Sequence, residues 1–381
     1  MAAAPQDPPT SPAAGLRRPR VVALGGGHGL YASLSALRLL DVDVTAVVTV
    51  ADDGGSSGRI RRELGLLPPG DLRMALSALA TGQLTGIADP AADPATGPAD
   101  GPAGLPWSTV LQHRMGGAGA LAGHPIGNLL LTGLMELHDD AVTALDAVAG
   151  LVGARGRVLP MSPRPLDLMA EVTSVDPDDP VQFRRIRGQS AIAATSGRVR
   201  SVRLLPANAP ACPEAVQAIL AADAVILGPG SWFTSVIPHL LVRGLAAALT
   251  TTGARLITVL NLEPQVGETD GFSPEEHLRV LYEHCPRLRV DVVVADQDAV
   301  LDRRSLHAYA EGIGARLVLA PIAEIDSRAR HDPCKLSLAV AEAAGLDRSR
   351  SDTPGDTPGD TPGDTQGDGG LHRGPTDEGV L

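Results

Sequence analysis

The sequence is poor in aromatic residues and in cysteine, and these absences narrow the class of protein. Aromatic residues make up 2% of the 381 residues, and the three cysteines, Cys212, Cys285 and Cys334, lie far apart. Such scattered cysteines form neither a disulfide framework nor a paired-cysteine metal site, so we expect a protein of the reducing cytoplasm. No apolar run reaches the roughly 20 residues that a membrane span needs. The N-terminus has no apolar core, so we expect no signal peptide.

The chain also lacks an excess of basic charge. Its formal net charge of −12 argues against a general nucleic-acid or acidic-membrane binder. Residues 1–19 are rich in Pro and Ala, and the acidic tail 346–381 carries four near-copies of Asp-Thr-Pro-Gly, so we expect both segments to be disordered. A Gly/Pro/Asp-rich stretch at about residues 81–106 is expected to be a flexible insertion. Residues 20–345 are expected to form a single α/β domain.

Two glycine-rich turns organise the first part of the chain. Each follows a short apolar run, at residues 21–24 and 47–50. The first turn consists of Gly25, Gly26, Gly27, His28 and Gly29. The second turn consists of Asp52, Asp53, Gly54, Gly55 and Ser56. Between them, residues 31–40 carry leucines at helical spacing. This order of strand, turn, helix, strand and turn predicts a βαβ unit.

The rest of the chain repeats this alternation of apolar strands and helices. The run at 224–227 leads into a third glycine turn that contains Gly228, Gly230, Ser231 and Thr234. The run at 256–260 leads into a polar loop that contains Asn261, Glu268 and Thr269. The pattern predicts an α/β fold, with a doubly wound, mostly parallel Rossmann-like sheet and helices on both faces. In such a sheet the loops at the carboxyl ends of the strands converge on one crevice, and we expect these turns to do so.

Several local elements follow from the same patterns. The apolar stretch at residues 134–151 predicts one helix. Asp71 stands where the N-cap of an Ala/Leu-rich helix is expected. Residues 184–187 and 199–204 are expected to be surface or edge strands.

The first turn is compatible with backbone N–H groups that wrap around a phosphate. It is not a Walker A loop, because no Gly-Lys-Ser/Thr follows, and it is not a good dinucleotide fingerprint either. Tight packing of a helix on a strand is the alternative explanation for its glycines. His28 lies inside an exposed turn rather than a core, which favours a ligand contact.

The second turn places two carboxylates, Asp52 and Asp53, at the end of a buried strand. This is costly unless they meet a metal, a hydroxylated ligand or N–H donors. An Asx turn, with Ser56 as the N-cap of the next helix, explains one carboxylate but not comfortably both. Mg²⁺ held by one or two carboxylates plus phosphate, and the hydroxyls of a ribose or sugar, remain equal alternatives. No cofactor follows with certainty.

Three polar residues near the next helices are further candidates for ligand binding. Arg73 lies within one helical turn of a glycine-led helix start, where it clamps a phosphate or is merely a surface residue. His124 and Asn128 flank a Pro and Gly turn ahead of a very apolar segment, where polar groups need partners.

The third turn and the loop after it leave two interpretations open. Ser231 and Thr234 cradle an anion or cap a helix, and Glu268 accepts hydroxyl hydrogen bonds from a ligand or caps a turn. The sequence shows no Ser/His/Asp order, HExxH motif or paired cysteines, so neither a hydrolase triad nor a zinc enzyme is supported.

Together these motifs resemble the bacterial YvcK family. The matching segments are Gly-Gly-Gly-His-Gly-Leu at 25–30, Thr-Val-Ala-Asp-Asp-Gly-Gly-Ser-Ser-Gly-Arg at 49–59, Gly-Asp-Leu-Arg at 70–73, Gly-His-Pro-Ile-Gly-Asn-Leu-Leu-Leu at 123–131 and Gly-Pro-Gly-Ser-Trp-Phe-Thr-Ser-Val-Ile-Pro at 228–238. Gly-Glu-Thr-Asp-Gly at 267–271 and Arg-His-Asp-Pro at 330–333 also match. The resemblance covers about residues 20–345.

The resemblance implies a gluconeogenesis factor that binds UDP-N-acetylglucosamine in the cytoplasm, with a role in cell shape and peptidoglycan synthesis on gluconeogenic carbon sources. No established reaction comes with that branch. The implied partners are the nucleotide sugar and regulators of cell-envelope synthesis, and a homo-oligomer is compatible with them. The wider superfamily contains the CofD enzymes, 2-phospho-L-lactate transferases of deazaflavin biosynthesis. An Mg²⁺-dependent transferase that uses a nucleotide diphosphate carrier is therefore the alternative.

The resemblance also implies roles for single residues. A Tyr and an Arg late in the chain contact the nucleotide sugar in the family, and Tyr309 and Arg330 are the matching positions. We expect the pyrophosphate to lie on the first and third glycine turns, Arg73 and Arg330 to balance its charge, and Tyr309 to stack on uracil. Pro333 stands where a relative has a phosphorylatable Thr, so we expect no regulation at that position.

Overall fold

The computed structural model describes residues 17–80, 104–173, 182–265, 267–327 and 329–346. The segments expected to be disordered, 1–19 and 346–381, and the expected insertion at about 81–106 lie almost entirely outside the described residues.

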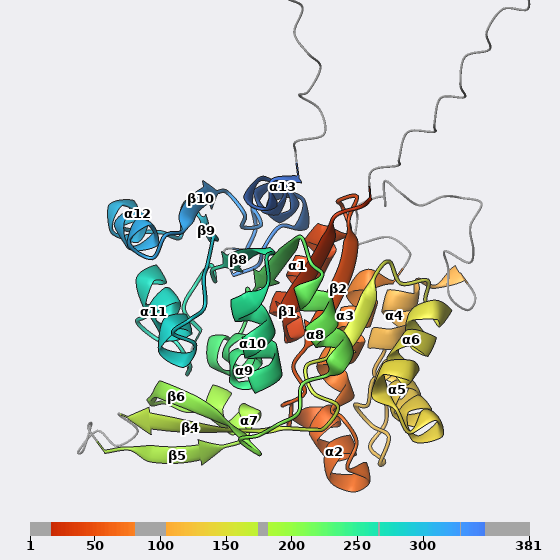
Figure 1. The fold of residues 1–381 in the computed structure, drawn as a ribbon. Helices are drawn as coiled ribbons and strands as arrows, with labels where there is room; N and C mark the ends of the chain where they lie inside the picture. The colour runs from red at the N-terminus through yellow and green to blue at the C-terminus, as the bar shows by residue number, and fades with distance from the viewer. Residues whose placement is uncertain (1–16, 81–103, 174–181, 266, 328, 347–381) are drawn as a thin grey trace, which may run out of the picture. The chain divides into compact units, whose positions relative to one another are not determined.

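A seven-stranded parallel sheet forms the centre of the fold, with the strand order β10-β9-β8-β7-β1-β2-β3 (Figure 1). Its strands are β1 (Arg20–Gly25), β2 (Asp43–Val48), β3 (Arg157–Pro160), β7 (Ala224–Leu227), β8 (Arg255–Val259), β9 (Val292–Asp296) and β10 (Arg316–Ala320). β1 and β7 are the central strands, and their apolar side chains are buried, as expected for a parallel sheet covered on both faces. The order reverses between β1 and β7, which is the switch point of a doubly wound sheet.

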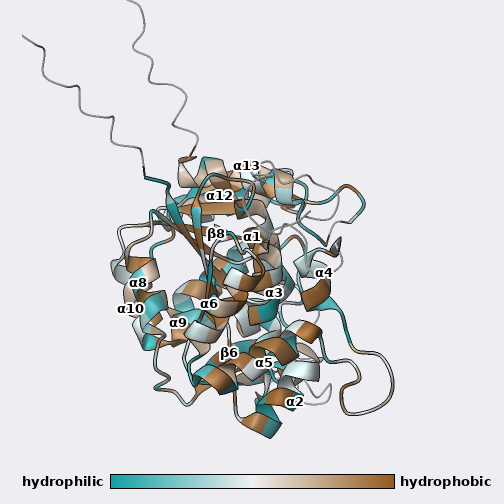
Figure 2. Cartoon of the chain, turned by 90° about the vertical axis from the view of Figure 1, so that its right-hand side faces the viewer, coloured by the Kyte–Doolittle hydropathy of each residue, from teal (hydrophilic) through white to brown (hydrophobic). Residues whose placement is uncertain are grey.

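Helices cover both faces of this sheet, so the predicted Rossmann-like α/β fold is confirmed (Figure 1). One face is covered by α1 (Gly27–Leu37), α3 (Pro69–Leu79) and α13 (Pro333–Ala344). The other is covered by α8 (Pro213–Leu220), the π-helical turn η2 (Trp232–Val236), α9 (Ile237–Leu241) and α10 (Arg243–Thr251). Figure 2 shows that these helices carry both hydrophobic and hydrophilic surfaces, as helices that pack one face on a sheet require.

The described residues form further helices. They are α2 (Gly55–Leu64), α4 (Trp107–Gln112), α5 (Ile126–His138), α6 (Ala141–Leu151), α7 (Gln189–Ala193), α11 (Pro274–His284) and α12 (Arg303–Gly312). Of these, α6 packs on β3 and α12 packs on β10. Across the described part of the chain, no single helix is long and apolar enough to cross a membrane. The bent helix pair Trp232–Leu241 and Arg243–Thr251 reaches the necessary length and composition only when the two helices are taken together.

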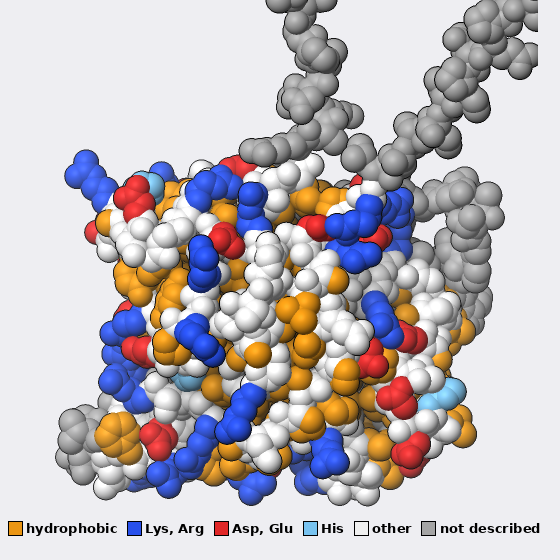
Figure 3. All heavy atoms as spheres, in the orientation of Figure 1, with side chains coloured by type: hydrophobic (Ala, Val, Ile, Leu, Met, Phe, Trp, Pro, Cys, Tyr) orange, Lys and Arg blue, Asp and Glu red, His pale blue; other side chains and the backbone are white. Residues whose placement is uncertain are grey.

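A second, three-stranded antiparallel sheet has the order β5-β4-β6. Its strands are β4 (Asp167–Thr173), β5 (Arg184–Arg187) and β6 (Arg198–Leu205), so the expectation of edge strands at 184–187 and 199–204 is confirmed. Alternate residues of β4 are buried, as in a sheet with one covered face. Basic side chains gather over this sheet in Figure 3. The sheet as a unit was not expected from the sequence.

The helix expected at residues 134–151 is in fact two helices, so that prediction is wrong. α5 (Ile126–His138) ends at Asp139, whose φ of 51° is left-handed, and α6 (Ala141–Leu151) begins after Asp140. The Asp140 carboxylate accepts hydrogen bonds from two backbone N–H groups in the first turn of α6. Aspartate tolerates left-handed backbone and caps helices well, so two polar residues outweigh the apolar periodicity on both sides.

The structure shows neither the expected helix cap Asp71 nor the alternative cap Ser56. The N-cap of α3 is Pro68, so Asp71 lies within the first turn of the helix. Proline presets the backbone and has no N–H to satisfy, which suits a helix start. The N-cap of α2 is Gly54, whose N–H donates to the Asp52 carboxylate at 2.9 Å, so Ser56 is already helical. Both helices begin earlier than their apolar patterns indicate.

Candidate functional site

The first and third glycine turns meet at the switch point of the sheet. A β-carbon built on Gly29 would lie 2.2 Å from the carbonyl oxygen of Pro229 and 2.4 Å from Cα of Gly230. Gly26 is confined as well, since its β-carbon would lie 2.5 Å from Cγ2 of Thr49. Only glycine permits such approaches. The two turns therefore form the sides of the crevice in which doubly wound sheets bind their ligands.

The start of α1 offers backbone donors to this crevice. The first helical hydrogen bond runs from the Leu30 N–H to the Gly26 carbonyl oxygen at 3.2 Å. The N–H groups of His28 and Gly29 come before it and have no helical acceptor. Free N–H groups and the positive end of a helix dipole favour an anion, so the geometry agrees with the anion site expected at the first turn, which stays a prediction.

The start of η2 is already occupied by a carboxylate of the chain itself. Glu268 is 4% exposed and accepts hydrogen bonds from Oγ of Ser231 at 2.6 Å, Oγ1 of Thr234 at 3.1 Å and the Phe233 N–H at 3.2 Å. Burial raises the pKa of Glu268, and these hydrogen bonds oppose the rise. Of the two interpretations open for Ser231, Thr234 and Glu268, the geometry favours the internal cap.

Two residues of the loop after β8 hold the third turn and the loop itself. Asn261 accepts a hydrogen bond from the Gly230 N–H at 2.8 Å and donates from Nδ2 to the Gly230 carbonyl oxygen at 2.9 Å. Thr269 is fully buried, and its hydroxyl oxygen accepts from the Gln265 N–H at 2.8 Å. The third turn and this loop are thus held rigidly by hydrogen bonds.

Replacing Glu268 by alanine is expected to lower the free energy of unfolding by about 2 kcal/mol, because the Phe233 N–H loses its acceptor inside the protein. Urea denaturation measures the change. The control is Glu283→Ala, since Glu283 is exposed and forms a 3.7 Å ion pair with Arg279; its loss is expected to cost less than about 0.5 kcal/mol. Equal effects of the two substitutions would show that Glu268 does not hold the turn.

Both carboxylates of the second turn have partners within the chain. Asp52 accepts the Gly54 N–H, and Asp53 accepts the N–H of Ser190 in α7 at 2.8 Å. Gly188 approaches so closely that its β-carbon would lie 2.1 Å from Oδ2 of Asp53. Asp53 therefore joins the second turn to the α7 segment, a contact between distant parts of the sequence that the sequence did not suggest.

A pair of acidic residues, Asp52 and Asp71, lies beside the first turn. Asp71 is half-buried; it accepts a hydrogen bond from the Gly27 N–H, and its buried Oδ2 has no hydrogen-bond partner. Burial, and secondly the nearby Asp52 carboxylate, raise the pKa of Asp71 to about 7. Burial also raises the pKa of Asp52. Two such carboxylates share one region of low polarity, which favours a proton or a cation between them.

The Mg²⁺ alternative fits this pair better than it fits the adjacent Asp52 and Asp53. Magnesium is usually bound by one or two carboxylates plus phosphate and water, and Oδ2 of Asp71 is a buried oxygen without a partner. Among the residues described, no group of three or more His, Cys, Asp or Glu side chains is placed to hold a metal ion. A metal here would therefore need oxygen ligands from a bound phosphate.

Arg73, Asn128, Ser56 and His124 form one buried chain of hydrogen bonds. Arg73 Nε donates to Oδ1 of Asn128 at 2.9 Å, and Nδ2 of Asn128 donates to Oγ of Ser56 at 2.9 Å. The Ser56 hydroxyl, 2.7 Å from Nδ1 of His124, then donates its proton to that nitrogen. Burial and the nearby Arg59 lower the pKa of His124, consistent with a neutral acceptor. The structure thus brings four sequence-predicted residues together.

A cavity of about 840 Å³ opens from the meeting point of the first and third turns. His28, Gly29 and Gly230 line one end of it, and Arg330 lines it from the loop before α13. Arg330 is an exposed residue whose Nε lies 3.2 Å from Oε2 of Glu324. Three groups predicted from distant parts of the sequence therefore line one cavity.

Tyr309 is not among the residues that line this cavity. It lies on α12 and is packed partly buried against the core, and burial raises its pKa. Sequence reasoning also missed residues that do line the cavity, namely Tyr31, Ser35, Glu263, Gln265 and His331. Tyr31 and Ser35 follow the first turn on α1 at helical spacing, which was a usable signal. His331 lies in the matching Arg-His-Asp-Pro segment, whereas Glu263 and Gln265 had no such signal.

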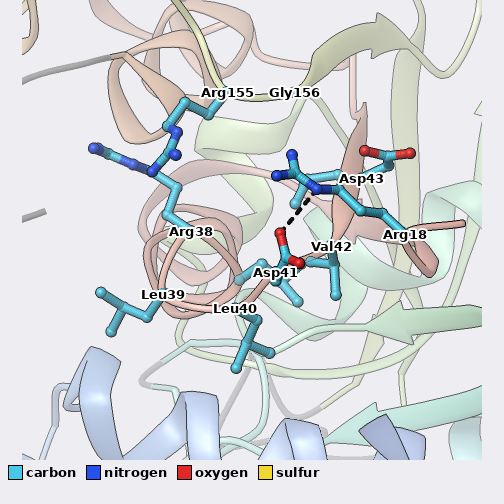
Figure 4. A pocket seen from close by; sticks show the side chains of 11 residues that line it. Arg18, Arg38, Leu39, Leu40, Asp41, Val42, Asp43, Arg155 and Gly156 are labelled. Carbon is cyan, nitrogen blue, oxygen red and sulfur yellow. Dashed lines mark ion pairs between the residues drawn. The ribbon is translucent and has the colours of Figure 1, made fainter. Parts of the chain in front are cut away.

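A second pocket, of about 520 Å³, lies at the opposite, amino-terminal edge of the sheet (Figure 4). It is lined by the end of α1 and the start of β2, and Arg18 forms a 2.8 Å ion pair with Asp41 at its mouth. Ligands of doubly wound sheets bind at the carboxyl ends of the strands. We therefore assign the functional site to the cavity at the switch point.

The fold and the two glycine turns define a Rossmann-like α/β protein with a cavity at its switch point. The chain belongs to the CofD family, described as "2-phospho-L-lactate transferase CofD", which it matches over residues 21–337. The resemblance to the YvcK group seen in the sequence is confirmed by relatives that carry the name gluconeogenesis factor.

Two of these relatives and one solved structure show the extent of the similarity. The "putative gluconeogenesis factor" of Mycobacterium tuberculosis H37Rv is 52% identical over 337 residues, which cover 88% of this chain and 93% of the relative. The "gluconeogenesis factor" of Listeria monocytogenes is 37% identical over 283 residues, covering 74% and 79%. A crystal structure of a UPF0052 family member from Bacillus halodurans has a TM-score of 0.72 and 31% identity, covering 86% of this chain and 99% of its own.

Proposed function

We propose that this protein is a gluconeogenesis factor that binds UDP-N-acetylglucosamine and regulates cell shape and peptidoglycan synthesis during gluconeogenic growth. The observation that carries the proposal is the cavity at the switch point, which joins the start of α1 to Arg330. A glycine-lined helix start binds phosphate oxygens, and an arginine at the far wall balances their charge. The names of the relatives support the biological setting.

In this proposal the pyrophosphate lies on the N–H groups of the first turn. The third turn forms the opposite wall rather than a second cradle, because Glu268 already fills the start of η2. Arg73 acts indirectly, since it is held by Asn128 within the buried chain of hydrogen bonds. The protein acts in the cytoplasm, with regulators of cell-envelope synthesis as its partners and with no need for catalysis.

Isothermal titration with UDP-N-acetylglucosamine, with and without Mg²⁺, tests the proposal. We expect selective binding near micromolar, about −8 kcal/mol, and no comparable binding of GDP. Arg330→Ala is expected to weaken binding at least about tenfold, or about 1.4 kcal/mol, because a charge-assisted contact is lost. Arg185→Ala is the matched control, since Arg185 is also exposed and ion-paired, with Glu171 at 3.3 Å. No binding by the wild type, or equal affinities in the two variants, would contradict the proposal.

A second candidate function is Mg²⁺-dependent transfer of a phospholactyl-type group from a nucleotide diphosphate carrier. The buried Asp52 and Asp71 pair favours it, because Mg²⁺ would neutralise both carboxylates and the phosphates at once. Product formation that requires Mg²⁺ would support the transferase. Saturable binding of the nucleotide sugar without turnover would support the regulatory protein.

A further inference from the structure

Three residues that line the cavity at the switch point each carry a buried polar side-chain atom without a hydrogen-bond partner. The atoms are Oγ of Ser35, Oε1 of Gln265 and Nε2 of His331, and all three are shielded from solvent. Ser35 itself is only 1% exposed. A buried polar atom without a partner costs free energy, so a cluster of them at one cavity indicates that a ligand supplies the missing hydrogen bonds.

The wall beyond these atoms is rich in acceptors. Glu263, Glu324 and Asp326 line the cavity from the loop after β8 and the loop before α13. Carboxylates only accept hydrogen bonds when ionised, whereas a serine hydroxyl both donates and accepts. Several hydroxyl groups on one ligand satisfy such a mixed set, because each hydroxyl donates and accepts as well.

Tyr31 adds an apolar surface to this polar cavity. It is the one Phe, Tyr or Trp among the described residues that line it, in a chain with few aromatic residues. Trp232 and Phe233, in contrast, are fully buried in the core. Tyr31 is half-buried and lies on the face of α1 that also carries His28 and Ser35, three and four residues away along the helix.

The phosphate donors and the polar cluster lie in one continuous cavity. His28 and Gly29 belong to the start of α1, and Ser35 lies two turns further along the same helix. A ligand anchored by phosphate at the first turn therefore places its next group beside Tyr31 and Ser35. An aromatic face with surrounding hydroxyl partners suits a hexose ring, whose C–H groups pack on the aromatic ring while its hydroxyls form hydrogen bonds at the rim.

We propose that this cavity is the sugar subsite, and that Tyr31 is the residue on which the hexose ring of a nucleotide sugar packs. This inference rests on the proposed function and adds which part of the ligand the cavity receives. Ser35, Gln265 and His331 bind sugar hydroxyls, and Tyr31 determines the preference for a nucleotide sugar over the bare nucleotide.

The test compares UDP-N-acetylglucosamine with UDP by isothermal titration. Tyr31→Ala is expected to weaken binding of the nucleotide sugar at least about tenfold and to leave the affinity for UDP within about twofold, because the aromatic packing involves only the sugar. Tyr31→Phe keeps the ring and is expected to stay within about threefold of the wild type for both ligands. Thermal unfolding confirms that each variant is folded.

Ser35→Ala provides a second, milder test with a matched control. The substitution is expected to weaken binding of the nucleotide sugar about threefold to tenfold, roughly the contribution of one hydrogen bond. The affinity for UDP is expected to stay unchanged. Ser77→Ala is the control, because the hydroxyl of Ser77 is also buried and without a partner, on α3, and does not line the cavity. It is expected to change neither affinity.

Equal losses for UDP and the nucleotide sugar in Tyr31→Ala would overturn the subsite assignment, because they would place the nucleotide against Tyr31. Unchanged binding of both ligands by that variant would overturn it as well. Failure of the wild type to bind the nucleotide sugar at all would overturn the proposed function, and the subsite with it. The two failures are therefore distinguishable.

Discussion

Replacing Gly29 by alanine is expected to lower the free energy of unfolding by about 3 kcal/mol and to abolish nucleotide-sugar binding. The added β-carbon would lie 2.2 Å from the carbonyl oxygen of Pro229 and 2.4 Å from Cα of Gly230. Both neighbours are backbone, so no side chain can rotate away. The first and third turns must separate, and the cavity between them changes shape.

Gly133→Ala is the matched control for this substitution. Gly133 also lies in a helix, α5, and a β-carbon built on it meets nothing within 4 Å. Since alanine is a better helix former, we expect it to stabilise the protein by up to about 1 kcal/mol. Urea denaturation followed by circular dichroism measures both variants, and isothermal titration measures binding. Equal stability of the two variants would contradict the close contact of the turns.

Replacing Asp71 by asparagine is expected to change how stability depends on pH. Burial raises the pKa of Asp71 from 3.8 to about 7 in the folded protein. Its protonated form therefore stabilises the fold fully below about pH 4, and this contribution is lost as the pH rises through about 7. The difference between the pKa of Asp71 in the unfolded and folded states corresponds to about 4 kcal/mol of folding stability. Asparagine does not titrate, so the variant is expected to gain stability relative to the wild type as the pH rises.

The gain is expected to be about 1.4 kcal/mol per pH unit between about pH 4 and 7, and to level off above. Urea unfolding of both proteins across this range measures it. Asp41→Asn is the control, because Asp41 is exposed and ion-paired with Arg18 at the opposite edge of the sheet. Its stability curve is expected to run parallel to that of the wild type. A parallel curve for Asp71→Asn would show that this carboxyl does not hold its proton.

The parallel sheet was predictable because its strands are buried on both faces. Runs such as 21–24 and 224–227 are apolar throughout and end in glycine, and this signal is local. The second sheet pairs strands whose charged residues face solvent, so its composition did not identify it as a unit. The break at Asp139 and Asp140 was missed because two polar residues interrupt a helix only through their own backbone geometry and hydrogen bonds.

The candidate site was predictable where glycine geometry forms it. The contact of Gly29 with Gly230 follows from the strand order, which places β1 beside β7. The partners of the acidic residues were not predictable, because Asp53 meets Ser190 and Glu268 meets Ser231 only in the folded chain. The stacking of Tyr309 on uracil stays a prediction. Tyr309 is not among the described residues that line the cavity.

The carboxylate of Glu268 makes the two walls of the crevice chemically different. At the start of α1, Asp71 accepts the Gly27 N–H, and the N–H groups of His28 and Gly29 have no helical acceptor. At the start of η2, the Phe233 N–H is already bonded to Glu268. A ligand that enters between them meets free N–H donors on one wall and donors already bonded to a carboxylate on the other. We therefore expect the phosphate-bearing end of the proposed ligand to dock at α1, and the rest of the molecule to extend along the cavity toward the loop before α13.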